Sequence, residues 1–508
     1  MEFGFSLAVL KNVFLPFNLL MATFGVVIGI IFGALPGFTA AMGIAILMPI
    51  TFSMTPEAGL IMMGALFAGA MWGGSVSAIL INTPGTPGAA ATVLDGYPMA
   101  KQGRAADALR ESVVSSFVGG ILGVIVLQLF APPLARVSLM FGPPEYFVLA
   151  IFGMTIIASL SEKMIIKGYI SGFLGMLIGT MGMDPLLGVP RFTFGITGLI
   201  DGVMLVPALI GLFSIPEVME IIQMHGSREE MIPNLKNIKI GFPTWAHTRR
   251  MIPTYLRSST IGLIVGILPG AGASIASFMA YNEEKRASKT PEKFGTGMIE
   301  GVAASEAANN SICAGAFIPM LTLGVPGDSV AAIMMGALMV HGLQPGAELF
   351  TTYADVTWTF IMSLYLANVL MLFFGLYCAP WFSWATRTPK HILAISIVLL
   401  TTVGAFAVRE SMTDVYVMLA FGIIGYLLKS HGFDVVPVVL GLILGPMAEK
   451  GLNGTLAISY GQNTAWFILQ RPVSLILIGL TLFALIIPYW RAKRKEKDPF
   501  ASQEADIT

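Results

Sequence analysis

The chain has 508 residues, of which 55% are hydrophobic and 11% are charged, and its formal net charge is zero. Soluble domains carry about a quarter charged residues, so this composition excludes an ordinary soluble protein and predicts a chain embedded in lipid. The neutral charge balance gives no indication of nucleic-acid binding. Apolar runs without period-2 alternation predict membrane-spanning helices and not a barrel.

Residues 1–224 form the first predicted membrane half, and it contains two Pro-Gly breaks. An apolar run near 13–34 leads into Gly33-Ala-Leu-Pro-Gly37, and another near 59–81 leads towards Thr86-Pro-Gly88. Pro removes a backbone donor and Gly accepts unusual dihedral angles, so each Pro-Gly should end one half-helix and start another. The second half-helix then offers unpaired N–H groups and a positive dipole end, which suit a carboxylate.

Residues 225–257 are the longest polar interval, with three Pro and eight Lys, Arg or Glu residues, and are predicted to be a cytoplasmic linker. Residues 258–490 form the second predicted membrane half. Residues 491–508 begin with a basic run after the last apolar segment, which predicts a cytoplasmic tail under the positive-inside rule.

The two halves share an internal repeat. Three landmarks recur in the same order, 233, 235 and 239 residues later: Gly33-Ala-Leu-Pro-Gly37 as Gly266-Ile-Leu-Pro-Gly270, Thr55-Pro-Glu57 as Thr290-Pro-Glu292, and Thr86-Pro-Gly88 as Val325-Pro-Gly327. Recurrence at nearly constant spacing indicates duplication of one structural unit.

Loop charges indicate how the two copies are inserted. Segment 282–293 holds four Lys or Arg and its counterpart 51–57 holds none, whereas 101–110 holds three and its counterpart 341–346 none. The positive-inside rule then predicts opposite insertion, an arrangement that places substrate near the midplane at the repeat interface. The predicted fold is an all-α polytopic membrane protein with two inverted-topology repeats, re-entrant hairpins and Pro-Gly-broken helices.

Small hydroxyl and amide residues cluster at the breaks and could bind an anion without a buried Lys or Arg. The alternative is that Pro and Gly only kink helices and let them pack closely; four breaks paired by a repeat favour a site. The candidate substrate-binding residues are Pro36, Gly37, Thr39, Asn82, Thr83, Thr86, Pro87, Gly88, Pro269, Gly270, Ser274, Pro326, Gly327, Asp328 and Ser329.

A second polar cluster lies within an apolar stretch of the second half. Glu306, Asn309, Asn310 and Ser311 are candidate ion-coupling residues, because carboxylate, amide and hydroxyl oxygens at membrane depth suit Na⁺ or proton coupling. A Na⁺ ion could be held by Glu306 and Asn310. A polar helix contact with a neutralised Glu306 is the open alternative.

No nucleotide loop, nucleophile motif or metal-ligand spacing is found, so we expect neither an enzyme nor a cofactor beyond a coupling ion. Two other classes of function stay open at this stage. One is a membrane enzyme in which Glu300, Glu306 and Asp328 form an acid–base group. The other is an anion channel.

Several of these motifs resemble the large membrane permease subunit of tripartite tricarboxylate transporters, the TctA type. The stretches that carry the resemblance are Gly33–Phe52, Ile81–Gly96, Gly188–Gly195 with Asp201-Gly202, Gly266–Ala280, Leu323–Ser329 and Gly441–Pro446. Together they extend over nearly the whole chain.

The resemblance implies a partnership and a driving force. It implies a small membrane subunit of the TctB type and a periplasmic solute-binding protein of the TctC type that delivers a di- or tricarboxylate such as citrate. It also implies uptake driven by an ion gradient, usually Na⁺, in the bacterial inner membrane.

Overall fold

The computed structural model describes residues 6–495, except for 160–164, 185–187, 224–239, 269, 271, 383–387, 389 and 461. Nearly all described elements are helices, and the strands among them form one short antiparallel hairpin of β1 (Gly182–Met183) and β2 (Pro190–Arg191). Six described helices are long and apolar enough to cross a membrane. The predicted all-α, multi-pass class is therefore confirmed.

The chain divides into two compact units, and each takes segments from both predicted halves. Unit 1 comprises Met1–Leu139 and Met204–Leu427, and unit 2 comprises Met140–Val203 and Leu428–Thr508.

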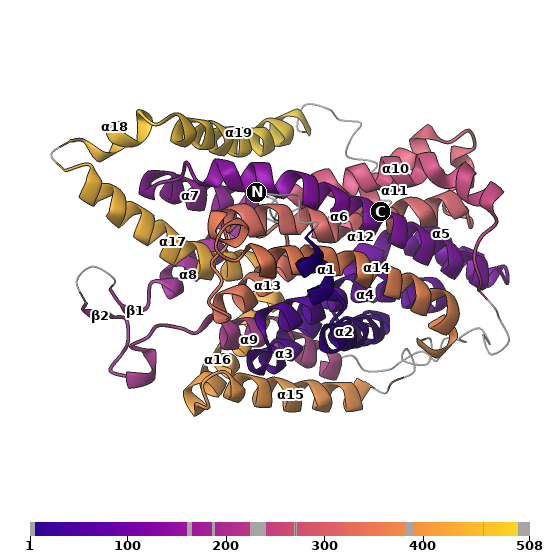
Figure 1. Ribbon diagram of the computed structural model, residues 1–508, viewed down its shortest axis with the longest axis horizontal. Helices are drawn as coiled ribbons and strands as arrows, with labels where there is room; N and C mark the ends of the chain where they lie inside the picture. Colours follow the sequence, from indigo (N-terminus) through magenta and orange to yellow (C-terminus); the bar gives the residue numbers. More distant parts are fainter. Residues whose placement is uncertain are drawn as a thin grey trace. The chain divides into compact units, whose positions relative to one another are not determined.

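Unit 1 carries most of the helices (Figure 1). Its elements are α1 (Leu7–Val13), α2 (Pro16–Ala34), α3 (Ala40–Leu47), η1 (Met48–Ser53), α4 (Pro56–Ile81), η2 (Pro87–Ala89), α5 (Ala90–Lys101), α6 (Ala105–Ser138), α9 (Leu205–Gln223), α10 (Trp245–Ile267), α11 (Gly272–Ala287), η4 (Pro291–Lys293), α12 (Ile299–Leu323), α13 (Ser329–Val340), η5 (Ala347–Phe350), α14 (Ala354–Phe382), α15 (Lys390–Ala407) and most of α16 (Met412–Ser430).

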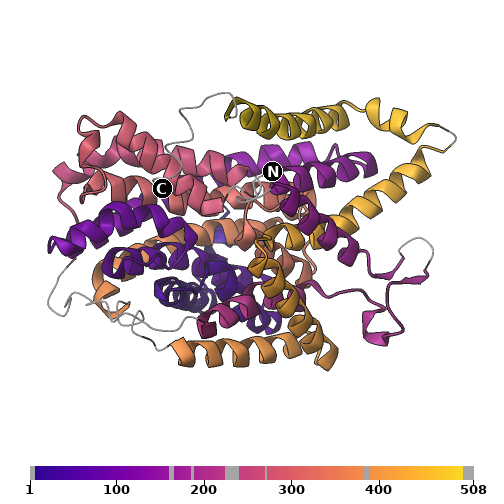
Figure 2. The ribbon, with the colours of Figure 1, turned by 180° about the vertical axis from the view of Figure 1, so that it is seen from behind.

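The core of unit 1 is built from two closely packed helix pairs, α2 with α4 and α10 with α12. Lipid gives helices little hydrophobic reason to associate, so small residues that let backbones approach are the usual means of packing. A Cβ atom on Gly29 would lie 2.3 Å from the carbonyl oxygen of Leu66, and one on Gly262 would lie 2.4 Å from that of Ala308. α12 also packs along α6, as both views show (Figures 1 and 2).

The two pairs use matching positions of the sequence repeat. Gly33 packs against the carbonyl of Ala70 in the first pair, and Gly266 packs against the carbonyl of Ile312 in the second. The helices that follow the first and third breaks contact elements of the other sequence copy. α11 packs against η2 and α5, and α3 packs against α13. The opposite insertion of the two copies in a membrane stays a prediction.

Unit 2 comprises α7 (Pro143–Ser159), α8 (Ile165–Gly179), the β1–β2 hairpin, η3 (Thr197–Leu199), α17 (Val436–Ile458), α18 (Thr464–Leu469) and α19 (Pro472–Lys495). α17 packs against α7 and α8, and a Cβ atom on Gly441 would lie 2.2 Å from the carbonyl oxygen of Gly172. The Arg191 guanidinium bonds Asp184 at 3.0 Å and Glu449 at 2.6 Å, which fastens the hairpin to α17.

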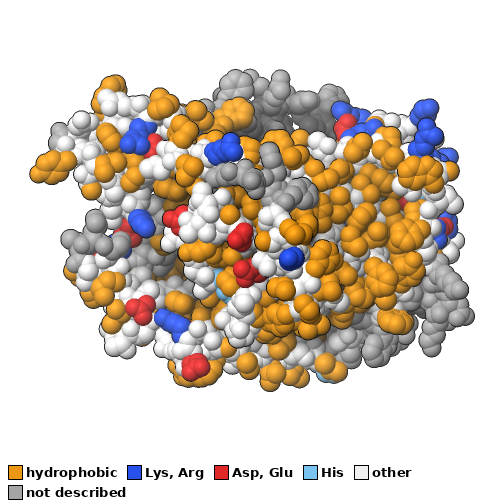
Figure 3. Space-filling model, in the orientation of Figure 1, with side chains coloured by type: hydrophobic (Ala, Val, Ile, Leu, Met, Phe, Trp, Pro, Cys, Tyr) orange, Lys and Arg blue, Asp and Glu red, His pale blue; other side chains and the backbone are white. Residues whose placement is uncertain are grey.

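Apolar side chains cover a broad area of unit 1. Figure 3 shows hydrophobic side chains across the face that carries α14, where Val369 and Phe373 are about half exposed. Exposed apolar area of this extent suits contact with lipid or with other apolar helices.

The predicted linker and tail are described only in part. Residues 224–239 of the linker and 496–508 of the tail lie outside the described residues. α10 begins at Trp245, so the end of the predicted linker is helical.

Candidate functional site

All four predicted break segments interrupt helices of unit 1. They separate α2 from α3, α4 from α5, α10 from α11, and α12 from α13. Gly37 and Gly270 adopt φ values of +83° and +82°, a region that favours glycine, while Pro269 lies outside the described residues. Asn82 ends α4 and Gly324 ends α12, both in the left-handed conformation.

Helices that follow two of the breaks begin with side-chain caps. Thr39 accepts a hydrogen bond from the Met42 amide at 3.2 Å at the start of α3. Asp328 accepts one from the Ala331 amide at 2.7 Å at the start of α13. Each cap satisfies one of the orphan amides at a helix N-terminus and leaves others available.

Contacts link the four breaks to one another. A Cβ atom on Gly85 would lie 1.8 Å from the carbonyl oxygen of Gly33, so the second break packs on the end of α2. Ser274 Oγ donates to the Pro87 carbonyl at 3.1 Å, which joins the start of α11 to the second break. The Gly270 amide donates to the Gly327 carbonyl at 2.7 Å, which joins the third break to the fourth.

These contacts revise the pairing of breaks that sequence alone suggests. Gly327 packs against the carbonyl of Gly266 as Gly85 packs against the carbonyl of Gly33. The structural counterpart of Val325-Pro-Gly327 is therefore Thr83-Pro-Gly85, and the pairing with Thr86-Pro-Gly88 was wrong by three residues. Two Thr-Pro-Gly tripeptides stand side by side, and only the carbonyl contact selects between them.

The candidate substrate residues divide by exposure. Gly37, Asn82, Thr83 and Pro87 are exposed. The partly buried members are Pro36, Thr39, Gly270, Ser274 and Ser329, and the buried ones are Thr86, Gly88, Pro326, Gly327 and Asp328. The first two groups can meet a ligand directly, whereas the buried members shape the backbone behind them.

Segments 35–41, 82–90, 266–274 and 324–331 contain no Lys or Arg. An anion bound here would therefore rest on helix N-termini, small hydroxyl and amide groups, and any cation that binds with it.

Glu306 lies beside the second break and is fully buried on α12. Thr92 Oγ1 of α5 and Ser116 Oγ of α6 both donate to its carboxylate, the second at 3.0 Å. Ser75 of α4 and Asn309 also lie next to this carboxyl group. Sequence reasoning did not select Thr92 or Ser116; the one available signal was the place of Thr92 in the conspicuous stretch Ile81–Gly96.

Asn309 belongs to this cluster, whereas Asn310 and Ser311 do not. Asn309 Nδ2 donates to the Met71 carbonyl at 3.1 Å. Its Oδ1 packs directly against Gly88, since a Cβ atom added to Gly88 would lie only 1.8 Å from it. Asn310 Nδ2 instead meets Met371 Sδ of α14, and Ser311 Oγ donates to the Ser259 carbonyl of α10. The structure thus brings together only two of the four predicted ion-coupling residues.

The carboxylates of the alternative enzyme site have separate partners. Glu300 pairs with Arg250, Glu306 accepts from hydroxyl groups, and Asp328 caps α13. No shared acid–base arrangement links these three described carboxylates.

The comparison with known proteins identifies the family. Residues 19–440 match the Tripartite tricarboxylate transporter TctA family. The chain belongs to this family. The predicted resemblance is confirmed, and membership makes the chain a tricarboxylate transporter large subunit of a kind that works with other subunits.

Two relatives of this TctA-family chain come from Agrobacterium vitis. One is described as an uncharacterized 52.8 kDa protein in the TAR-I ttuC' 3' region; it is 36% identical over 480 residues, 94% of this chain and 95% of the relative. The other, an uncharacterized protein in the TAR-II ttuC' 3' region, is 36% identical over 237 residues, 47% of this chain and 97% of the relative. No solved structure matches this chain.

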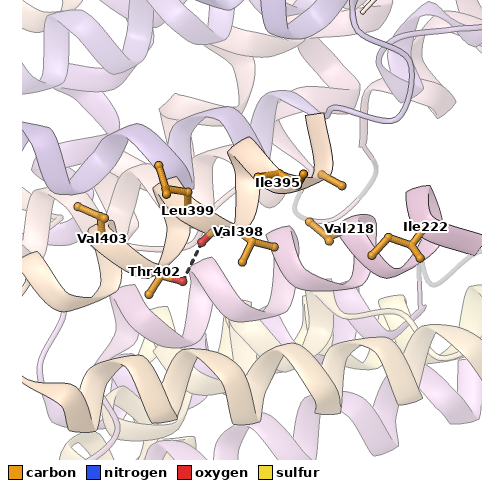
Figure 4. A pocket seen from close by; sticks show the side chains of 8 residues that line it. Val218, Ile222, Ile395, Val398, Leu399, Thr402 and Val403 are labelled. Atoms are coloured by element: carbon orange, nitrogen blue, oxygen red, sulfur yellow. Dashed lines mark hydrogen bonds between the residues drawn. The ribbon is translucent and has the colours of Figure 1, made fainter. Parts of the chain in front are cut away.

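An apolar groove of the TctA-family chain lies near the first break, since its lining residues Val218 and Ala394 pack in one cluster with Leu35 and Phe38. α9 contributes Val218 and Ile222, and α15 contributes Val398, among others, around a volume of about 460 Å³ (Figure 4). Its one hydroxyl, on Thr402, already donates to the Val398 carbonyl at 2.7 Å. Without free polar groups, this groove does not suit a carboxylate.

Proposed function

We propose that the chain is the large subunit of a binding-protein-dependent secondary transporter that imports a di- or tricarboxylate with a coupled cation, expected to be Na⁺. A small membrane subunit of the TctB type and a periplasmic solute-binding protein of the TctC type complete the system. The chain lies in the bacterial inner membrane with its C-terminus in the cytoplasm. Family membership supports the class of transporter, and the geometry of the breaks supports the mode of binding.

The observation that carries the proposal is the convergence of four helix breaks. Gly33 meets Gly85, Ser274 meets Pro87, and Gly270 meets Gly327, so four interrupted helices restart close together. Amides at the starts of α3, α5, α11 and α13 provide partial positive charge for carboxylate groups. Binding sites made of discontinuous helices at a repeat interface are a recurring transporter arrangement.

In this mechanism the substrate carboxylates take up the amides and hydroxyls that caps and backbone pairs leave available. Ser274 holds the start of α11 against the Pro87 carbonyl and so fixes the distance between the second and third breaks. The absence of Lys and Arg from the break segments keeps the site from holding the anion too tightly for release. A cation bound near Glu306 would add positive charge to the site on loading.

The test is uptake of a labelled carboxylate into proteoliposomes that contain the chain, its small membrane subunit and the binding protein. We expect saturable uptake that requires an imposed ion gradient and the binding protein. Ser274→Leu should abolish uptake because its side chain would separate α11 from Pro87, while membrane insertion persists. Asn82→Leu, at an exposed break position, should also impair uptake.

The same preparation distinguishes the two rival functions. An anion channel would show conductance without saturable, ion-coupled uptake. An enzyme would convert its substrate without any gradient. Uptake that ignores every imposed ion gradient would contradict secondary coupling.

A further inference from the structure

The buried carboxylate of Glu306 has no oppositely charged side chain beside it among the described residues. Its side chain has no exposed surface, and the groups that donate to it, Thr92 Oγ1 and Ser116 Oγ, are neutral hydroxyls. None of the ion pairs found among the described residues includes it. An isolated carboxylate in a low-dielectric interior is very costly, so a positive charge must accompany it or a proton must neutralise it.

Further oxygen atoms lie near Glu306 besides the hydroxyl oxygens of Thr92 and Ser116. Asn309 Oδ1 is buried beside Glu306 and has no hydrogen-bond partner among the described residues, and Ser75 Oγ places a further oxygen atom next to the carboxyl group. Buried polar atoms are nearly always satisfied, so an orphan acceptor beside a carboxylate without an ion-pair partner points to a bound ligand. A cation that takes oxygen ligands would satisfy this acceptor and balance the carboxylate charge together.

We propose that Glu306, Ser75, Thr92, Ser116 and Asn309 form a site for a monovalent cation, Na⁺. The inference rests on the proposed transport function, since it names the residues that hold the coupling ion. One carboxylate among neutral oxygens balances a single positive charge, whereas a divalent ion would leave an excess charge buried. Oxygen-only donors suit a hard cation. This set replaces Asn310 and Ser311, which contact other helices.

The site is connected to the second break through two contacts. Gly88 packs directly on Asn309 Oδ1, so the position of that amide depends on the break backbone. Thr92 lies in the first turn of α5, immediately after the break, and its hydroxyl binds the Glu306 carboxylate. A cation that draws Thr92 and Asn309 together would therefore order the start of α5, where Pro87 meets Ser274. This contact path explains how cation and carboxylate binding could assist one another.

The experiment measures cation binding without transport. The purified chain in detergent is melted in NaCl, and in KCl or choline chloride at the same ionic strength, at several pH values. A ligand that binds the folded state raises the melting temperature as its concentration exceeds Kd. We expect a Na⁺-specific rise for the wild type and none for Glu306→Gln.

Matched controls come from the neighbouring residues of α6. Glu111→Gln removes another buried carboxylate and should keep the full Na⁺-dependent rise. Ser116→Ala should lower the apparent Na⁺ affinity, read from the rise in melting temperature, at least about tenfold. Ser115→Ala, which alters a buried hydroxyl that donates to the Glu111 backbone carbonyl, should leave this affinity unchanged. If Glu306→Gln does not fold, Ser75→Ala and Thr92→Val supply the same test with the carboxylate intact.

A Na⁺ response that survives Glu306→Gln, or that is lost equally in Glu111→Gln, would overturn the site. So would a wild-type melting temperature that follows pH but not Na⁺, which would indicate a protonated Glu306. Because this assay needs no substrate and no partner subunit, its failure leaves carboxylate uptake untouched, and failed uptake would not alter a measured Na⁺ response.

Discussion

Two buried carboxylates on neighbouring helices of unit 1 differ in the side chains that surround them. Glu111 of α6 accepts from Tyr255 Oη at 2.7 Å and lies 2.7 Å from His247 Nε2 of α10. Glu306 of α12 is surrounded by neutral hydroxyl and amide groups among the described side chains, with Thr92 and Ser116 donating to it. The first cluster opens to the surface through His247, which is 28% exposed, whereas the second is fully enclosed.

The difference separates a structural charge from a charge kept for a ligand. The protein itself supplies a protonatable partner for Glu111, so that cluster joins α6 to α10 without help. Among the described residues it supplies no cation for Glu306, yet it places the orphan oxygen atom of Asn309 beside the carboxylate. Buried unpaired charges in membrane proteins are expected at ion pathways.

The largest expected effect is on the free energy of unfolding when each carboxylate is neutralised in turn. Glu111→Gln should lower the unfolding free energy by about 2 kcal/mol, because charge-assisted bonds to Tyr255 and His247 are lost. Glu306→Gln in Na⁺-free buffer should not lower it, since the change removes an uncompensated charge. Thermal melting in detergent measures both. Equal destabilisation by the two variants would contradict the comparison.

A second test addresses the junction between the Glu306 cluster and the second break. Gly88→Ala would place a Cβ atom 1.8 Å from Asn309 Oδ1, an overlap that we expect to cost about 1–3 kcal/mol and to weaken Na⁺ binding. Asn309→Ala in the same chain should restore part of the stability but not the Na⁺ response. Gly479 in α19, where an added Cβ atom would meet nothing within 4 Å and φ is not positive, provides a control for the effect of alanine without overlap.

A third, smaller effect is expected at the contact between breaks. Ser274→Ala removes the hydrogen bond to the Pro87 carbonyl, worth about 1 kcal/mol. Uptake should show a KM raised several-fold, and Ser274→Thr should keep much of the wild-type affinity. An unchanged KM would mean that this contact does not position the substrate.

The smallest expected effect is a pH dependence at the Glu111 cluster. The hydrogen bond and negative charge of Glu111 raise the pKa of His247 above its ordinary value of 6.5. A raised pKa means that the stabilisation is fully present below pH 6.5 and is lost as the pH rises through the folded-state pKa. Relative to His247→Gln, the wild type should melt higher at pH 6, and this advantage should shrink at higher pH. A constant difference would sink the assignment.

Much of the fold could be predicted because its causes are local. Composition alone requires lipid-facing helices, and Pro and Gly end helices through their own backbone chemistry, as at Gly37 and Gly270. Gly33 and Gly266, which the repeat pairs, both let a backbone carbonyl of the partner helix approach closely, as small residues do in membrane helix packing. The family followed from the same motifs.

The arrangement of the units could not be predicted from order along the chain. Unit 1 and unit 2 each combine segments from before and after the linker, because contacts between distant helices and not sequence neighbours define a compact unit. The true partner of the fourth break, Gly85, was likewise hidden by a neighbouring identical tripeptide. It was revealed only by the carbonyl of Gly33.

The sequence by itself determined that this chain is a membrane protein with broken helices and a polar segment around Glu306. Only the tertiary structure decided which oxygen atoms surround that carboxylate. Successive residues of an α-helix are about 100° apart, so Asn309, Asn310 and Ser311 face three different neighbours although they are adjacent in sequence. The remaining members, Ser75, Thr92 and Ser116, come from three other helices, and only packing brings them together.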